Sequence, residues 1–243
     1  SEAFRIIRTN MDFMRVKSEK LQVVMFTSAN PGAGKTFVSS NLAMSIAQTN
    51  KKVVLVDVDI RKGTLSGIFS NSSNRMGLTH YLSGSTDKLD DIVGRSEEDD
   101  KLDVIFSGPV PPNPAELLLS ERFDRLMTEL RKCYDYIIVD NVPAGMVADA
   151  SIVNRVADLT IFVVRSGVMD RRQLPELENM YRQEQLRNMS VILNGVPSDH
   201  KGYGYGYGYG YGYGYGYGNE SHGRKHGRYE NLKKLFSRLL KHS

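Results

Sequence analysis

The sequence predicts an α/β protein with a mostly parallel sheet, helices on both faces of that sheet, and a disordered Tyr-rich C-terminal tail. Apolar runs alternate with helical patterns along the body, and several runs are apolar throughout, as in strands covered on both faces. The tail alternates tyrosine with glycine, a composition that opposes a packed core. The runs expected to be strands span residues 21–27, 53–57, 102–107, 136–140, 159–164 and 189–194.

The chain divides into three parts. With 243 residues, of which 40% are hydrophobic, it can form one packed domain plus appendages. We place the domain at residues 1–200, a disordered Tyr-Gly repeat arm at 201–219, and a basic tail with a short amphipathic helix at 220–243. Residues 219–243 contain seven Lys or Arg and two Glu, so the rest of the chain carries about −1 of the net +4. This distribution argues against a uniformly basic nucleic-acid-binding domain.

The loop after the first apolar run has the pattern of a phosphate-binding loop. It lies between an expected strand and a helical stretch, which is the context in which this motif binds a nucleotide. Gly32 and Gly34 let the backbone turn its amides toward a phosphate, and the helix N-terminus adds partial positive charge. Lys35 can reach the terminal phosphates, and Thr36 offers a hydroxyl to Mg²⁺. The residues expected to bind the nucleotide here are Ala29, Asn30, Pro31, Gly32, Ala33, Gly34, Lys35, Thr36 and Phe37.

Three carboxylates follow the ends of expected strands. Asp57 and Asp59 leave one strand two residues apart, so both side chains point toward the crevice at the carboxyl ends of a parallel sheet. Asp140 ends a third run in the same manner. Three acidic strand ends exceed what simple hydrolysis needs. One carboxylate can hold metal-bound water while another orients or deprotonates an attacking hydroxyl.

Together, these motifs resemble those of the bacterial tyrosine kinases. That family combines a loop ending PGxGK[ST], the pattern hhhDxDxR and an acidic strand end, matched here by residues 31–36, 55–61 and 137–140. It also carries the patterns EAxRxLRTN and PPNPxELL, matched by residues 2–10 and 111–118. The resemblance implies a P-loop NTPase-like fold, the cofactors ATP and Mg²⁺, and transfer of phosphate to protein tyrosines.

The resemblance also implies roles for individual residues. Lys35 and Thr36 hold the phosphates and Mg²⁺, while Asp59 and Asp140 position the metal. Asp57 orients or deprotonates the tyrosine hydroxyl, although the roles of Asp57 and Asp59 can be exchanged.

Two further crevice residues are implied by the same resemblance. Arg165 and Asn194, which follow or end later strands, line the nucleotide, and Asn194 lies near the base. Ordinary loop roles for this pair stay open.

The tail supplies the expected phosphoacceptors. Beside a kinase-like site, the repeat becomes an acceptor arm that reaches the crevice of a neighbouring subunit, with a low-complexity linker as the alternative. The acceptors are Tyr203, Tyr205, Tyr207, Tyr209, Tyr211, Tyr213, Tyr215 and Tyr217. Beyond the arm, the spacing of Leu232, Leu235 and Leu239 among basic residues predicts a helix that faces an anionic membrane or docks on the body.

Residues 1–17 are expected to form a helix whose apolar stripe packs on the body. Glu2, Arg5 and Arg8 lie three residues apart on a neighbouring face. A similar ExxRxxR stretch in the kinase family forms contacts between subunits of a ring, so these residues are the expected oligomer interface. An exposed charged face is the alternative.

The resemblance extends to partners and location. It implies a homo-oligomer such as a ring, a membrane polysaccharide co-polymerase region fused upstream or separate, and a cognate phosphotyrosine phosphatase. It further implies regulation of capsular or exopolysaccharide polymerisation and export at the cytoplasmic face of the bacterial inner membrane. We expect this fragment itself to be soluble, since it has no apolar run of 18 residues. The single cysteine, Cys133, suits a reducing compartment.

Two other function classes stay open at this point. A partition or positioning ATPase shares the fold, but that class has a signature lysine where this loop has Asn30. A nucleotide-binding scaffold without turnover would not need the lysine, the threonine and all three carboxylates.

Overall fold

A computed structural model describes residues 2–17, 21–63, 65, 69, 76–96, 99–144 and 149–197. The repeat arm, the basic tail and the eight candidate acceptor tyrosines lie outside these residues. The predicted division into domain, arm and tail therefore stays a prediction.

Seven strands form one sheet in the order β3-β4-β2-β5-β1-β6-β7. Neighbouring strands are parallel except for β3 and β4, which are antiparallel. The strands are β1 (Val23–Ser28), β2 (Val53–Asp57), β3 (Val93–Arg95), β4 (Leu102–Ile105), β5 (Tyr136–Asp140), β6 (Leu159–Arg165) and β7 (Ser190–Asn194). The mostly parallel α/β prediction is confirmed, and six strands match the predicted runs. Strand β3 was not predicted, because three residues at a sheet edge are too short to show a hydrophobic period.

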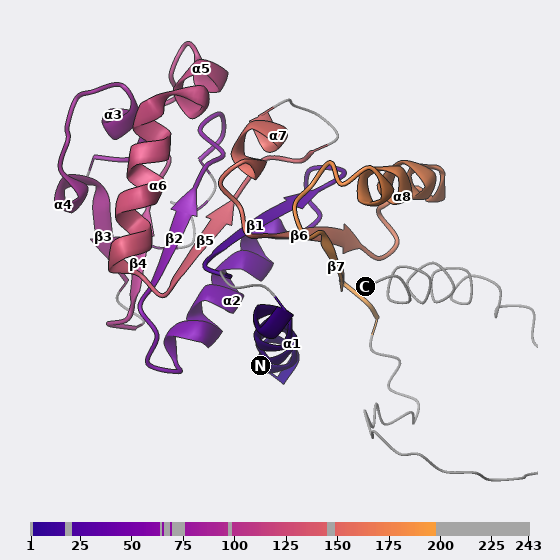
Figure 1. Ribbon diagram of the computed structural model, residues 1–243. Helices are drawn as coiled ribbons and strands as arrows, with labels where there is room; N and C mark the ends of the chain where they lie inside the picture. The colour runs from indigo at the N-terminus through magenta and orange to yellow at the C-terminus, as the bar shows by residue number, and fades with distance from the viewer. Residues whose placement is uncertain are drawn as a thin grey trace, which may run out of the picture. The chain divides into compact units, whose positions relative to one another are not determined.

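Helices cover both faces of this sheet (Figure 1). One face carries α1 (Glu2–Lys17) and α2 (Lys35–Ala47). The other carries mainly α3 (Leu78–Leu82), α4 (Leu89–Ile92), α5 (Pro114–Leu119), α6 (Glu121–Cys133), α7 (Asp149–Asn154) and α8 (Leu174–Arg182), with the short 3₁₀ helix η2 (Arg171–Gln173) before α8. Within the described residues, no helix combines the length and apolar character needed to span a bilayer.

The strands alternate their side chains between two cores. On β1, Val24 and Phe26 pack against α2, whereas Val23 and Met25 face the opposite core, and all four are fully buried. Because both faces are buried, the central strands carry apolar residues at consecutive positions and not only at alternate ones.

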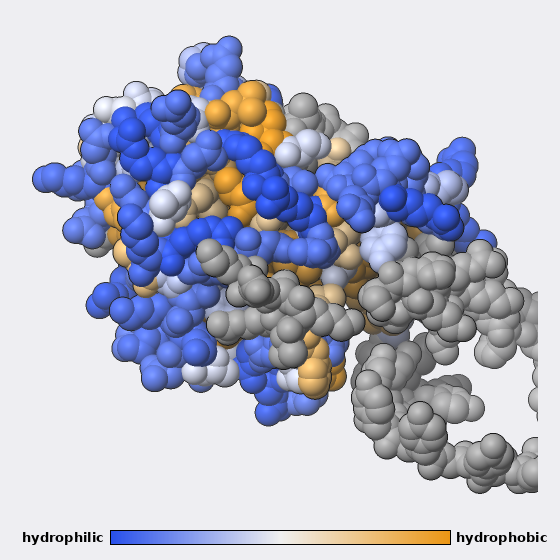
Figure 2. All heavy atoms as spheres, viewed as in Figure 1, coloured by the Kyte–Doolittle hydropathy of each residue, from blue (hydrophilic) through white to orange (hydrophobic). Residues whose placement is uncertain are grey.

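Most of the surface seen in Figure 2 is hydrophilic, with apolar side chains reaching it beside α5.

The N-terminal helix α1 packs on α2. Phe4 and Met11 are buried in the core of that face, and Ile7 packs against it. Arg8 donates a hydrogen bond from Nη1 to the carbonyl of Ser45 on α2 at 2.6 Å. Helix α1 is therefore held by both apolar and polar contacts to the body.

A polar network ties the start of β1 to the start of β6. Both carboxylate oxygens of Asp158 accept hydrogen bonds from Arg131 at 2.8 Å, and Oδ2 also accepts from the backbone amides of Gln22 and Val23. Burial raises the pKa of Asp158, but these hydrogen bonds outweigh it and bring the pKa below its usual value. The ionised carboxylate therefore joins two central strands to α6.

We predict that Asp158→Ala lowers the free energy of unfolding by about 2–4 kcal/mol, because it leaves Arg131 and two amides without their acceptor. Urea denaturation of the two proteins measures the difference. Glu178→Ala, which removes an i,i+4 ion pair with Arg182 on the surface of α8, is the control and should cost less than about 0.5 kcal/mol. Equal losses for both variants would contradict a stabilising role for this network.

Candidate nucleotide and catalytic site

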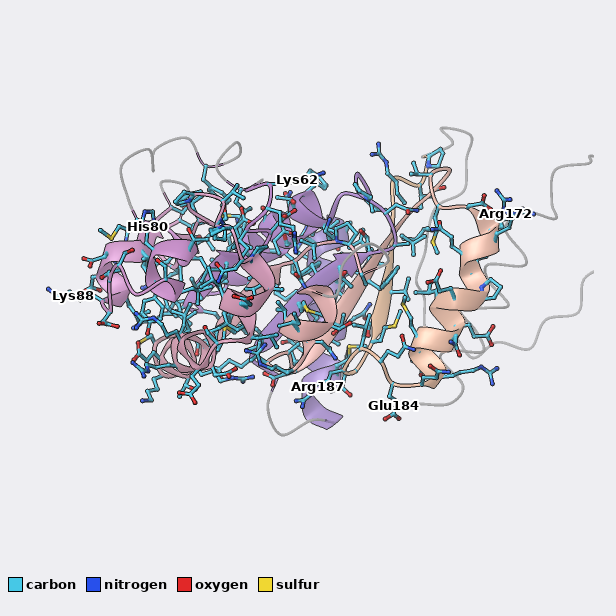
Figure 3. All side chains as sticks on the ribbon, turned by 90° about the horizontal axis from the view of Figure 1, so that it is seen from above. Lys62, His80, Lys88, Arg172, Glu184 and Arg187 are labelled. Atoms are coloured by element: carbon cyan, nitrogen blue, oxygen red, sulfur yellow. The ribbon has the colours of Figure 1, made fainter. Side chains whose placement is uncertain are left out.

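The predicted phosphate loop joins the end of β1 to the start of α2. Gly32 and Gly34 have positive φ values of 76° and 91°, and Gly34 is the N-cap residue of α2. These angles lie in the left-handed region that favours glycine. The loop follows the carboxyl end of a central strand, where parallel sheets bind ligands. In Figure 3, Lys62 and Arg172 follow β2 and β6 at the carboxyl ends of the strands. Glu184 and Arg187, which precede β7, lie toward the opposite, amino ends.

The individual loop residues differ in their surroundings. Ala33 is buried in the core beneath α2, whereas Pro31 and Gly32 are exposed and Ala29 is half-buried. Phe37 is 57% exposed and makes an edge-to-face contact with Phe4 of α1, with ring centroids 6.1 Å apart. Phe37 therefore links the first turn of α2, directly after the loop, to the N-terminal helix.

Side chains from the β6–β7 half of the sheet hold the loop from outside. Arg165 donates from Nη1 to the carbonyl of Gly32 at 2.8 Å. Asn194 donates from Nδ2 to the carbonyl of Ala33 at 3.0 Å. The amide nitrogen of Asn194 occupies the space that a Cβ at Gly34 would need. Both predicted crevice residues thus contact the loop backbone.

A third contact to the loop comes from Gln173, which was not predicted from the sequence. The amides of Asn30 and Gln173 are reciprocally hydrogen-bonded, at 2.9 Å from Asn30 to Gln173 and 3.4 Å in return. The two residues lie 143 positions apart, and nothing in the local sequence of Gln173 signals the contact. Beneath the pair is a small cavity of about 60 Å³ lined in part by Phe162, Met169 and Leu177.

The three carboxylates lie on the same face of the sheet as α2. Val58 and Ile60 are buried in the opposite core, which places Asp57 and Asp59 on the α2 side, as alternation predicted. Asp140 ends β5 and pairs in register with Asp57 at the end of β2. Adjacent parallel strands therefore deliver Asp57 and Asp140 side by side.

Asp57 is fully buried, and both of its oxygens accept backbone hydrogen bonds. Oδ1 accepts from the amide of Asp59 and Oδ2 from that of Leu65, each at 3.1 Å. Burial raises the pKa of Asp57 to about 7, assisted by the charges of Asp140 and Asp59 and opposed by the two backbone hydrogen bonds. A carboxyl group with this pKa can both accept and release a proton near neutral pH.

Lys35 and Asp140 share one electrostatic environment. Burial lowers the pKa of Lys35, against the charges of Asp140, Asp59 and Asp57. Burial also raises the pKa of Asp140 to about 6, against a hydrogen bond from Thr36 and the charge of Lys35. Lys35 thus interacts electrostatically with all three predicted carboxylates.

Comparisons with known proteins agree with this geometry. Residues 21–189 match the AAA domain family. The tyrosine-protein kinase YwqD of Bacillus subtilis is 41% identical over 206 residues, which cover 84% of this chain and 85% of that protein. The tyrosine-protein kinase CpsD of Streptococcus agalactiae serotype Ia is 36% identical over 203 residues, with 84% and 85% coverage. This chain belongs to the bacterial tyrosine kinase family.

A solved kinase structure shares the same fold. The kinase domain of the Escherichia coli tyrosine kinase ETK superposes with a TM-score of 0.75 at 35% identity, covering 89% of this chain and 80% of that domain. The P-loop NTPase-like fold implied by the sequence resemblance is therefore confirmed, and the family is that of the kinases.

The kinase offers a partial set of ligands for a divalent cation. Among the residues described, Oδ1 of Asp140 is buried without a hydrogen-bond partner, and the hydroxyl of Thr36 bonds to the same carboxylate. No group of three His, Cys, Asp or Glu side chains within the described part of the chain is arranged to hold a metal alone. This arrangement fits Mg²⁺, which keeps several waters and is bound through one or two carboxylates together with nucleotide phosphates.

We predict that Gly34→Ala weakens Mg-ATP binding to the kinase at least about tenfold. Alanine is strained at a φ of 91°, and its Cβ would displace the side chain of Asn194. Isothermal titration calorimetry measures the change. Gly84→Ala imposes a similar strain, at a φ of 84° in the turn after α3, and is the matched control that should leave ATP affinity unchanged. Equal ATP affinity for Gly34→Ala and wild type would contradict the loop's role.

The raised pKa values of Asp57 and Asp140 predict how the stability of the metal-free kinase depends on pH. Both carboxyls titrate near pH 4 when unfolded but near about 7 and about 6 when folded, so the folded state binds more protons between these values. Their stabilising contribution is complete below about pH 4 and is lost as the pH rises through about 7. Urea denaturation from about pH 5 to about pH 8 should show this decline, and Asp57→Asn should flatten it. An identical decline in the variant would refute the raised pKa of Asp57.

Proposed function

We propose that this kinase uses ATP and Mg²⁺ to phosphorylate tyrosines of its own C-terminal arm, largely between subunits. The observation that carries the proposal is the placement of Lys35 among three carboxylates at the start of α2, one of them with a pKa near 7. A phosphate group in the loop would meet backbone amides, the helix N-terminus and the Lys35 ammonium. Asp57 belongs to the same cluster of charges, which an incoming tyrosine would enter.

The chemistry assigned to the chain's own residues is proton removal and charge stabilisation. The tyrosine oxygen attacks the γ-phosphorus, its proton passes to Asp57, and the bond from phosphorus to the oxygen of the ADP leaving group breaks. Lys35 offsets the negative charge on the phosphate oxygens as the bond breaks. Mg²⁺ held through Thr36, Asp59 and Asp140 would supply further neutralisation of the phosphates.

The pKa of Asp57 supports its assignment as the residue that acts on the hydroxyl. A general base works best when its pKa lies near the operating pH, and burial brings the pKa of Asp57 to about 7. Asp59 is less buried, which suits a residue that holds the metal through water. The two roles remain exchangeable within this proposal.

We further infer a homo-oligomer, such as a ring, that uses the charged face of α1. Glu2 and Arg5 form an ion pair on the surface, with side chains 69% and 66% exposed. They are accessible to a second copy, whereas Arg8 is already bonded to Ser45 of its own chain. If Arg8 also contacts a second copy, it would either keep its hydrogen bond to Ser45 or exchange that bond for the new contact.

The biological setting that we propose follows from the family. The kinase would act at the cytoplasmic face of the bacterial inner membrane with a polysaccharide co-polymerase region, fused upstream or separate, and would regulate capsular or exopolysaccharide polymerisation and export. A cognate phosphotyrosine phosphatase would reverse its modification. This setting predicts that the phosphorylated state changes with polysaccharide output in the producing cell.

The decisive measurement is intact-mass spectrometry of phosphatase-treated protein after incubation with Mg-ATP. Wild type should gain phosphates stepwise up to the eight tyrosines of the repeat arm. Lys35→Met alone should gain none, because it lacks the ammonium that holds the terminal phosphates. Mixed with an active chain whose arm is deleted, Lys35→Met should become phosphorylated, which would establish transfer between subunits.

Other outcomes would replace the proposal. ATP hydrolysis without added mass would indicate a positioning ATPase. Nucleotide binding with neither activity would indicate a scaffold. Phosphorylation of wild type without phosphorylation of Lys35→Met in the mixture would restrict transfer to a chain's own arm.

A further inference from the structure

Two neighbouring strand ends hold two consecutive carbonyls of the phosphate loop. Arg165 and Asn194 are direct partners in the parallel register of β6 and β7. Arg165 bonds to the carbonyl of Gly32 at 2.8 Å, and Asn194 bonds to the carbonyl of Ala33 at 3.0 Å. We call this pair of side chains the clasp. Two side chains from neighbouring strands therefore bind two consecutive carbonyls of the loop.

The clasp fixes the direction of two loop amides. In a planar trans peptide, the C=O and the N–H point in opposite directions. The carbonyl of Gly32 shares its peptide with the N–H of Ala33, and the carbonyl of Ala33 shares its peptide with the N–H of Gly34. Holding both carbonyls toward β6 and β7 therefore turns both N–H groups to the other side of the loop. Successive N–H groups turned the same way form an anion-binding concavity.

The two amides have no other task in the described part of the molecule. Neither the N–H of Ala33 nor that of Gly34 donates a hydrogen bond to a protein atom there. The carbonyl of Gly34, by contrast, accepts from the amide of Val38 as the first bond of α2. Two loop carbonyls are thus bound by the clasp, while the two amides remain available to donate to a phosphate.

The clasp is itself held in position. The carboxamide oxygen of Asn194 accepts from the amide of Gly195 at 2.9 Å, which turns its nitrogen toward the loop. The carbonyl of Asn194 accepts from the amide of Ser166 at 2.8 Å, continuing the pairing of the two strands. The Cγ of Arg165 lies 3.5 Å from the Cβ position of Gly195, so the arginine stem passes over that glycine. The carboxyl ends of β6 and β7 therefore support the loop.

We propose that Arg165 and Asn194 are positioning residues that preorganise the phosphate loop, and that they act through its carbonyls instead of through contact with the base. The inference rests on the proposed nucleotide site and deepens it. It differs from the expectation that Asn194 lies near the base. The two ideas make different predictions for ligands that carry phosphates without a base.

The test compares Mg-ATP with Mg-tripolyphosphate, each titrated calorimetrically into the wild-type chain and Asn194→Leu. The variant keeps the size and neutrality of the side chain but removes the donor. A clasp that orients amides should weaken both ligands by the same factor, about five- to tenfold, as expected for one lost hydrogen bond. A contact with the base would weaken Mg-ATP alone. Asn179→Leu on the exposed surface of α8 is the matched control and should change neither affinity.

Arg165 gives a second and independent test, because its side chain is exposed and its loss should not prevent folding. Arg165→Met should raise the KM for ATP about five- to tenfold and leave kcat within about twofold, since the loop is preorganised before chemistry. Arg165→Lys retains a donor and should recover part of the loss. Arg187→Met, before the amino end of β7 (Figure 3), is the control for removing an exposed arginine.

The outcomes separate this inference from the proposed function. If wild type binds neither ligand, the nucleotide site itself is wrong. If wild type binds both ligands but the clasp variants bind them equally well, or lose affinity only for Mg-ATP, the clasp is overturned. Thermal unfolding without ligand should be unchanged in Arg165→Met. If Asn194→Leu does not fold, Asn194→Ala replaces it in the same comparison.

Discussion

The left-handed turn at Gly34 is the constraint on which the site depends. It ends the loop that joins β1 to α2 and places Lys35 at the first position of that helix. The turn also leaves room for the side chain of Asn194, which no residue with a Cβ would permit. The loop is therefore shaped both by its own glycines and by the strands beside it. Its amides are oriented before any ligand arrives, which reduces the reorganisation needed on binding.

Around this loop the kinase concentrates charge that would be unfavourable elsewhere. Asp57 and Asp140 are buried at neighbouring strand ends, and burial raises the pKa of each. Lys35 partly compensates them, although its own pKa is lowered by the same burial. If stability alone mattered, apolar residues would be favoured at these positions over buried charged ones. Ionisable groups with perturbed pKa values cluster at functional sites, so at the proposed nucleotide site function and stability oppose each other.

The rest of the domain stabilises this arrangement from a distance. The network of Arg131, Asp158 and Gln22 joins β1, β6 and α6 at the amino ends of the strands, opposite the site. Helix α1 adds a second attachment through Arg8 and through the contact of Phe4 with Phe37. That contact makes the N-terminal helix a neighbour of the phosphate loop. The proposed oligomer face and the proposed nucleotide site are thus adjacent on one chain.

Several features could be predicted from the sequence because their cause is local. The six long strands follow from continuous apolar runs, the phosphate loop from glycines followed by Lys35 and Thr36, and the shared face of Asp57 and Asp59 from the period of a strand. The family resemblance rests on the same local motifs. The short strand β3 gave no such signal, since three residues with only edge pairing do not set a periodicity.

By itself, then, the sequence determined six of the seven strands, the position of the phosphate loop and the carboxylates at or just after two strand ends. Only the tertiary structure decided the strand order and the partners of the loop. Gln173 meets Asn30, and Asn194 meets Ala33, across 143 and 161 residues of chain. Their pairing depends on β6 packing beside β1, and β7 beside β6, in the assembled sheet. Short-range patterns encode local backbone preferences, whereas contacts of this kind exist only after distant segments have been brought together by burial of the common core.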